Sequence, residues 1–257
     1  MPSLVRPLVS SLKKSLKGVA LDELSALITS LFSAGEQGAF YVPQPIVNGA
    51  QALFQDAAGT VPVTADGDPI GSTKDQSPND RSSIQSVSTR RPVYSTDGAL
   101  NFAAFDGIDS FLQATYGAAV TPPCTLSIAM NRLDTSEAAI LLSGLGFSTR
   151  HQISLSGSRI LIGVSGGSSI SGNELPVGKH IITLVINGAS SSLRVDGLVV
   201  ASGTLDNSVA ATGLTIGSGS GGSNAIKQDV YGIVHAEGID KVDDIESYLS
   251  GLAGVAI

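Results

Sequence analysis

Short runs in which apolar and polar residues alternate fill most of the chain from residue 100 onward, and this period of two is typical of β-strands. In residues 125–131, Leu126, Ile128 and Met130 fall on one face, and residues 179–186 form the most apolar run. Such runs predict many short strands, each half-buried or buried. They are expected at residues 100–105, 110–114, 125–131, 139–143, 152–156, 158–164, 179–186, 191–195, 198–202, 214–216 and 228–236.

Tight turns separate these runs. Asn187-Gly188 and Asp196-Gly197 lie between apolar segments, which is the strongest short-range signal of a β-hairpin. No helical pattern interrupts the series between residues 100 and 236, whereas a parallel α/β sheet needs a helix between successive strands. The sequence therefore predicts an all-β protein, an antiparallel sandwich or jelly roll.

Helical periodicity is confined to the two ends of the chain. Val5, Val9, Leu12 and Leu16 recur at heptad spacing, and Gly18 then interrupts the pattern. We expect two short N-terminal helices, at residues 3–17 and 22–33, and a short C-terminal helix at residues 240–253. The predicted organisation is a helical segment at residues 1–36 for anchoring or oligomerisation, followed by a jelly-roll domain at residues 37–257.

The apolar seam of the N-terminal segment allows three interpretations. It packs on its own β-domain, it docks or self-associates, or it lies on a membrane surface. No stretch approaches the roughly 20 apolar residues of a membrane span.

Composition narrows the choice of partner. Hydrophobic residues make up 42% and charged residues 14% of the chain, the opposite of a disordered sequence. Four of the 15 basic residues and none of the 22 acids lie in residues 1–18, which leaves 11 bases against 22 acids in the rest. An acidic body is a poor binder of nucleic acid. The absence of Trp and an aromatic content of 5% remove the usual surface on which sugars and bases stack.

Candidate chemistry is sparse. A single cysteine, Cys124, excludes an internal disulfide and a zinc cluster built on cysteines, and we expect it to be a small core residue. The three histidines, at positions 151, 180 and 235, show no local signature of a thiol's catalytic partner. Gly163-Val164-Ser165-Gly166-Gly167 matches the serine-elbow string, but no helix pattern follows it, so we expect a turn.

Three blocks carry a resemblance to a known family. They are residues 53–71 with Gly67-Asp68-Pro69-Ile70-Gly71 at their end, the run Phe105-Asp106-Gly107-Ile108-Asp109-Ser110-Phe111-Leu112, and the run Tyr231-Gly232-Ile233-Val234 followed by the C-terminal helix. The chain from Phe54 to Gly254 resembles the concanavalin A-like, laminin-G-like jelly rolls of tailed-bacteriophage virions. The resemblance implies the same jelly-roll fold and leaves the function open, because this superfamily includes lectins, hydrolases, adhesion modules and structural virion parts.

Several functional expectations follow from the resemblance. The hydrolases of this superfamily commonly carry the pattern Glu-x-Asp-x-x-Glu on one strand, and this sequence lacks that pattern. We therefore expect a non-enzymatic structural virion protein, either capsid-decorating or associated with the tail or baseplate, made in the bacterial host cytoplasm. The alternative is a module that binds a cell-surface glycan or receptor. Expected partners are other virion proteins and further copies of the chain, with a trimer favoured.

Calcium is the one ion that the resemblance brings into consideration, and no other cofactor or metal is expected. Asp66, Asp68 and Asp75 are candidate ligands, as in several laminin-G-like modules. A calcium site needs 6–8 oxygens, and aspartates among Gly and Pro also form turns. Both interpretations stay open at this point.

Overall fold

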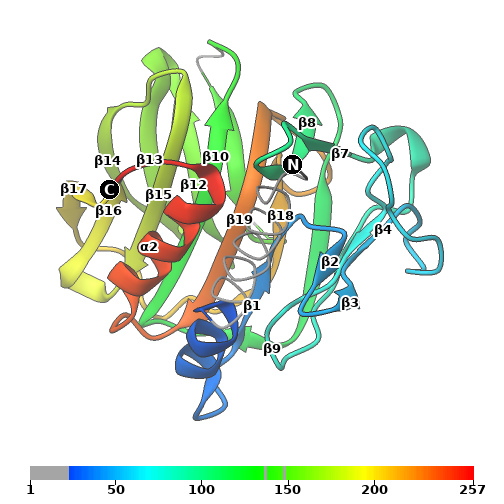
Figure 1. Cartoon of the computed structure of the whole chain (residues 1–257). Helices are drawn as coiled ribbons and strands as arrows, with labels where there is room; N and C mark the ends of the chain where they lie inside the picture. Colours follow the sequence, from blue (N-terminus) through cyan, green and yellow to red (C-terminus); the bar gives the residue numbers. More distant parts are fainter. Residues whose placement is uncertain (1–22, 136–137, 147–148) are drawn as a thin grey trace, which may run out of the picture.

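The computed structural model describes residues 23–135, 138–146 and 149–257. In this part of the chain, two antiparallel sheets pack face to face and helices cover the outer side of one of them (Figure 1). The prediction of an all-β antiparallel sandwich with helical segments at both ends is confirmed.

The eight-stranded sheet has the order β17-β16-β15-β10-β19-β8-β7, with β1 also paired to β19. Its strands are β1 (Gly38–Tyr41), β7 (Val93–Thr96), β8 (Asn101–Asp106), β10 (Cys124–Arg132), β15 (Gly178–Ile186), β16 (Ser191–Val195), β17 (Leu198–Gly203) and β19 (Lys227–Glu237).

The nine-stranded sheet has the order β14-β13-β12-β11-β18-β9-β6-β5-β4. Its strands are β4 (Leu53–Phe54), β5 (Ser72–Thr73), β6 (Ser83–Ile84), β9 (Leu112–Val120), β11 (Ala139–Ser143), β12 (His151–Ser156), β13 (Ile160–Ser165), β14 (Ser168–Glu174) and β18 (Ala211–Ile216). A small hairpin of β2 (Ile46–Val47) and β3 (Ala50–Gln51) stands apart. Three 3-10 turns complete the connections: η1 (Ser88–Arg90), η2 (Gly157–Arg159) and η3 (Gly188–Ser190).

The core between the sheets follows the alternation of the strands. Leu126, Ile128 and Met130 of β10 are fully buried there and face Ile153 of β12 and Leu214 of β18 within the same apolar cluster. Because side chains alternate across a strand, every second residue of β10 points the other way, toward the helices. One strand therefore serves two cores.

A second apolar core lies on the outer face of the eight-stranded sheet. It is built by α2 (Val242–Ala253) and by a helix whose described part covers residues 23–32, both of which pack on that face (Figure 1). Leu27 and Leu31 of the first helix and Leu249 of α2 are buried with Ala129 and Ile181 of the sheet. This core explains the polar-outside pattern of both helices.

The described residues include only part of the predicted N-terminal segment. The seam of Val5, Val9, Leu12 and Leu16 lies outside the described residues, so its role in assembly stays a prediction. The division at residue 36 also stays a prediction, although residues 24–32 contribute to a core shared with the sandwich. Within the described residues, no helix combines the length and the apolar character that crossing a membrane requires.

Candidate functional site

Three polar side chains meet deep between the sheets, and they come from widely separated parts of the sequence. Cys124 is the first residue of β10, His151 is the first residue of β12, and His235 lies near the end of β19. Since β10 and β19 belong to one sheet and β12 to the other, the cluster joins the two layers. All three side chains are fully buried.

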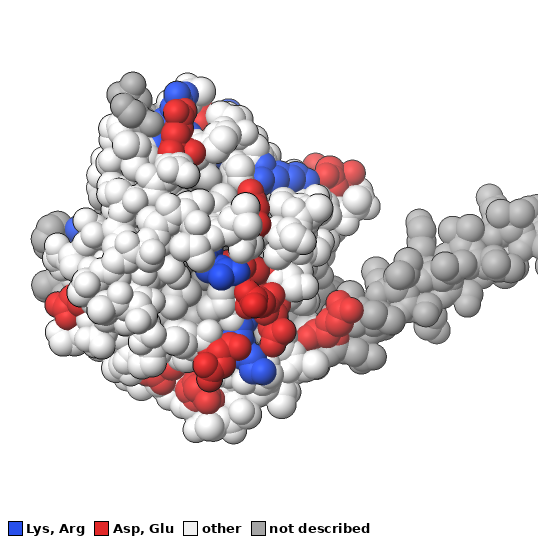
Figure 2. Space-filling model, turned by 90° about the vertical axis from the view of Figure 1, so that its left-hand side faces the viewer, with Lys and Arg blue, Asp and Glu red and all other residues white. Residues whose placement is uncertain are grey.

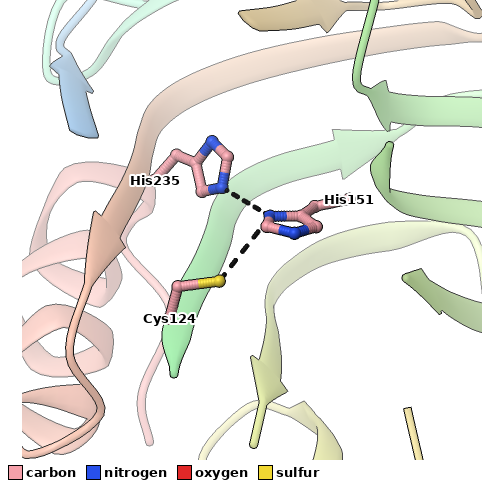
Figure 3. Close-up of side chains that lie close together, drawn as sticks. All are labelled: Cys124, His151 and His235. Carbon is pink, nitrogen blue, oxygen red and sulfur yellow. Dashed lines mark hydrogen bonds between the residues drawn. The ribbon is translucent and has the colours of Figure 1, made fainter. Parts of the chain in front are cut away.

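The cluster is compact, and the three side chains point toward one another (Figure 3). The Sγ atom of Cys124 lies 3.6 Å from Nδ1 of His151, and that Nδ1 lies 3.0 Å from Nε2 of His235. In the described part of the chain, this is the one group of three or more His, Cys, Asp and Glu whose ligand atoms all lie within 4.8 Å of one another.

The outer ring nitrogens of both histidines have partners of their own. Nε2 of His151 lies 3.1 Å from the carbonyl oxygen of Val209, and Nδ1 of His235 lies 3.2 Å from the hydroxyl of Tyr116. A carbonyl oxygen only accepts, so Nε2 of His151 carries the proton and Nδ1 presents a lone pair to Cys124 and His235. The ring orientations are therefore fixed from outside the cluster.

Burial determines the charge state of the cluster. It lowers the pKa of His151 to about 4 and holds the pKa of His235 well below its usual value, where the neighbouring His151 and Arg81 act in the same direction. It also raises the pKa of the Cys124 thiol. At neutral pH both imidazoles are uncharged and the sulfur is a thiol, because a charge would lose its hydration there.

A buried cation lies next to the cluster. The guanidinium of Arg81 is 4.6 Å from the centre of the Tyr116 ring, and it donates a hydrogen bond to Gln37. Arg81 is 5% exposed, and its Nη1 atom has no hydrogen-bond partner among the described residues. The cluster therefore sits beside a positive charge that is poorly screened by water.

This arrangement does not suit nucleophilic catalysis. A reactive thiol needs a lowered pKa and access for the substrate, and Cys124 has neither. Neutral imidazole nitrogens and a sulfur that converge on one point are instead the donor set of a soft metal ion.

The sequence analysis missed this cluster. It correctly placed Cys124 in the core, but it found no partner because His151 and His235 are 27 and 111 residues away. One signal was available. Each histidine is two residues from an inward-facing isoleucine, Ile153 or Ile233, so alternation alone puts both on the core side of their strands.

The candidate calcium ligands are not brought together. Asp66 accepts hydrogen bonds from Ser95 and Thr96, and Asp68 accepts them from the backbone of Thr64 and Ala65. Asp75 is occupied by four donors, which are the backbone N–H groups of Phe40, Ser77 and Arg81 and the hydroxyl of Ser77. Asp68 organises its own turn, which is the competing interpretation, whereas Asp66 and Asp75 link segments that are distant in the sequence.

A second group of polar side chains lies on the outer face of the eight-stranded sheet, just beyond the end of α2. Asn131 on β10 stands opposite Lys179 on β15 and Asp229 on β19, and its amide donates to Asp229 at 3.0 Å. We call these three residues the polar row. The half-buried ring of Phe102 lies beside it and packs against Tyr231, with the ring centres 5.5 Å apart.

The polar row carries a perturbed carboxyl. Asp229 is 8% exposed, and burial raises its pKa although Asn131 and Lys179 act in the opposite direction. Lys179 is held in place, because its ammonium donates to the carbonyl of Ala253 and lies 5.1 Å from the centre of the Tyr231 ring. Carboxyl, amide and ammonium thus stand side by side on three adjacent strands.

The side of the molecule that carries the edge strands β14 and β17 has a different character. Figure 2 shows this side, which is largely free of charged side chains apart from a narrow band where acids and bases alternate. Leu198 and Val199 on β17 are 72% and 55% exposed.

Comparison with known proteins identifies no family. No family model and no curated protein matches the chain. Solved structures do. A Trypanosoma rangeli sialidase is 13% identical with a TM-score of 0.54, over 92% of this chain and 38% of that one. A GH54 α-L-arabinofuranosidase is 14% identical with a TM-score of 0.62, over 88% of this chain and 64% of that one.

An arabinofuranosidase in complex with arabinofuranosyl-α-1,2-xylobiose matches at 13% identity, with the same TM-score of 0.62. The chain spans less than two thirds of each of these proteins. At such identities the likeness shows the fold alone.

The likeness corrects one expectation. The prediction that the chain is not an enzyme is wrong as it was drawn, because the sialidase and the arabinofuranosidases that match its fold are enzymes. The missing Glu-x-Asp-x-x-Glu strand excludes one arrangement of carboxylates in this fold and not catalysis in general.

Proposed function

We propose that this protein recognises a carbohydrate and that the polar row of Asn131, Lys179 and Asp229 contacts it. The observation that carries the proposal is the grouping of a carboxyl, an amide and an ammonium in one cross-strand register beside a half-buried aromatic ring. The structural neighbours that act on sugars support the choice of ligand class.

The chemistry of the row suits a sugar. A carboxylate accepts hydrogen bonds, an ammonium donates them and an amide does both, so adjacent hydroxyls of one ring find complementary partners. The exposed part of Phe102 offers an apolar surface to the C–H face of the ring. Sites of this kind combine a few fixed polar groups with an apolar wall.

Charge favours a neutral sugar. The chain has a net charge of -7, and the described residues lie in its acidic part. A negative body disfavours an anionic ligand such as a sialic acid, and the ammonium of Lys179 is already bonded to Ala253. A neutral pentose or hexose oligosaccharide avoids this repulsion.

Glycoside hydrolysis is a second candidate, and a specific pair of carboxyls favours it. Burial raises the pKa of Asp229, whereas hydrogen bonds from the backbone of Leu100 and Ala99 lower the pKa of Asp97. Burial raises the pKa of the Tyr231 hydroxyl to about 12, and both carboxylates act on it in the same direction. Two carboxyls whose environments move their pKa values in opposite directions are what an acid and its partner base or nucleophile need.

Calorimetric titration of the full chain tests both candidates. We expect saturable binding to a neutral oligosaccharide such as an arabinoxylan fragment, with no binding to sialyllactose. Asn131→Ala should weaken binding by up to about tenfold, because a hydrogen bond between uncharged groups contributes roughly 0.5–1.5 kcal/mol. Glu174→Gln, on β14 of the other sheet, is the matched control and should bind as the unmodified protein does.

The outcomes separate the candidates. Release of reducing sugar that Asp229→Asn abolishes would assign hydrolysis, and binding without release would leave recognition alone. The proposal fails if no neutral oligosaccharide on a glycan array binds saturably, or if Asn131→Ala and Asp229→Asn bind as tightly as the unmodified chain.

The virion setting stays a prediction. A phage structural protein is expected from the resemblance of residues 54–254 to jelly rolls of that kind, and a carbohydrate-recognising domain is consistent with an exposed position on such a particle. Immunolabelling of purified particles would test this placement.

A further inference from the structure

The buried cluster of Cys124, His151 and His235 has the properties of a metal centre and is separate from the polar row. We propose that these three side chains hold a single Cu⁺ ion between the two sheets. The inference is independent of carbohydrate recognition, since the cluster lies in the inter-sheet core and the polar row lies on the outer face.

Two of the three ligand separations are close to those around a shared metal, and all three ligand atoms lie within 4.8 Å of one another. Metal–sulfur and metal–nitrogen bonds of about 2.3 and 2.0 Å place a sulfur and a nitrogen about 3.6 Å apart at near-tetrahedral angles. The Cys124 Sγ and His151 Nδ1 atoms are 3.6 Å apart. The two imidazole nitrogens, at 3.0 Å, need to separate by only a few tenths of an ångström.

The groups around the cluster are those that orient metal-bound histidines. A metal-ligating histidine almost always donates its other N–H to a carbonyl, carboxylate or water. His151 does so to Val209, and the second nitrogen of His235 meets the Tyr116 hydroxyl. Both imidazoles are thereby directed at the same point, and Nδ1 of His151 has its lone pair available.

Without an ion the thiol of Cys124 must share its acceptor in the cluster. The lone pair on Nδ1 of His151 faces the S–H of Cys124 and Nε2 of His235 together. If Nε2 of His235 is protonated, two donors compete for one lone pair. If it is not, two lone pairs face each other at 3.0 Å. An ion removes the conflict, because the thiol proton leaves to solvent and all three lone pairs point at the metal.

The summed charge of the three ligands favours Cu⁺ over Zn²⁺. A thiolate with two neutral imidazoles carries one negative charge, so Cu⁺ gives a neutral centre and Zn²⁺ gives a positive one. The cluster is fully buried, and the Arg81 guanidinium already lies beside Tyr116. A further positive charge is costly in that environment. Thiolate and imidazole ligands with three donors suit Cu⁺.

The test uses the full chain, loaded during refolding because the centre is closed to solvent. The protein is unfolded and reduced without oxygen, refolded with one equivalent each of Cu⁺ and Zn²⁺, desalted and assayed for both metals. We expect about one copper per chain, an X-ray absorption spectrum with one sulfur and two nitrogen scatterers, and a melting temperature raised by roughly 5–10 °C when free Cu⁺ is about 100-fold above its Kd.

Two variants and a matched control complete the design. Cys124→Ser and His151→Gln should retain less than about a tenth of the copper, while His180→Gln should retain all of it. His180 is the third histidine, and it is bonded to Asp196 away from the cluster. Circular dichroism confirms that each variant is folded, and the stoichiometry and spectrum of the unmodified chain test the proposal even if a variant does not fold.

Retention of less than about a tenth of an ion by the refolded unmodified chain would overturn the proposal. So would a copper spectrum without a sulfur scatterer, or copper that Cys124→Ser keeps. Zinc retained in preference to copper would overturn the choice of ion and the charge argument behind it.

Discussion

Replacing Arg194 by methionine removes the only cation that contacts Glu246 in the described structure. Arg194 lies on β16, and its Nε and Nη2 atoms donate to the two carboxylate oxygens of Glu246 on α2 at 2.9 and 2.8 Å. The Glu246 side chain is 1% exposed and that of Arg194 is 19% exposed. This paired contact attaches α2 to the sheet, beside the second apolar core.

The expected loss in the free energy of unfolding depends on which residue of the ion pair remains. Methionine preserves the packing of the arginine stem but strands a carboxylate in a buried site, which costs about 3–5 kcal/mol. For a chain of this size that corresponds to a fall in melting temperature of roughly 6–20 °C. The exposed contact to Asp243 contributes little, because an ion pair in water is worth at most about 1 kcal/mol.

Urea unfolding followed by circular dichroism measures the effect. The double variant Arg194→Met/Glu246→Met is the control, because it removes both charges and should unfold within about 1 kcal/mol of the unmodified protein or be more stable. Asp243→Asn should change stability by less than about 1 kcal/mol. A single Arg194→Met variant as stable as the double variant would refute the reasoning.

Three further predictions concern other parts of the fold. Gly38→Ala should destabilise by roughly 3 kcal/mol in urea unfolding, because a Cβ at its φ of +154° would lie 2.1 Å from the carbonyl oxygen of His235. Gly35→Ala, with open space around it, should cost only about 1–2 kcal/mol, and equal losses at the two glycines would contradict the clash. Leu249→Ala should cost about 2–5 kcal/mol by the same assay, since this fully buried side chain fills the core under α2; a loss below about 1 kcal/mol would mean that α2 packs loosely. Hydrogen bonds from Thr60 and Val61 lower the pKa of Asp56 to about 2. The stability that these bonds contribute is therefore present above the pKa of the unfolded chain, near 4, and is lost as the pH falls through about 2. An NMR titration of Asp56 with a midpoint near 4 would contradict this.

The strands could be read from the sequence because their signals are local. Asp196 and Gly197 have φ values of 49° and 81°, the pair of positive angles that a two-residue hairpin turn requires, and they join β16 to β17 as expected. Asn187-Gly188 also joins two paired strands, but through the 3-10 turn η3, because Asn187 keeps a negative φ of -149°. The residues of β14 gave no clear strand signal, since their Ser- and Gly-rich sequence has few apolar residues to alternate.

The candidate sites were less predictable for a physical reason. The polar row depends on the register of β10 against β15 and β19, which pairs Asn131 with Lys179 and Asp229 across 48 and 98 residues. Its three side chains look like ordinary surface residues until the sheet is assembled. The histidines show no partner in the sequence for the same reason, because their partners lie on distant strands.

The sequence by itself determined the all-β class, most strand positions from residue 100 onward, most turns there and the inward faces on which Cys124, His151 and His235 lie. Those properties depend on backbone geometry and side-chain alternation over a few residues. Only the tertiary structure decided that the three inward positions meet at one point. Their meeting depends on pairing between distant strands and on the packing of one sheet over the other, and the hydrophobic effect that drives this packing is non-directional and leaves no fixed spacing in the chain.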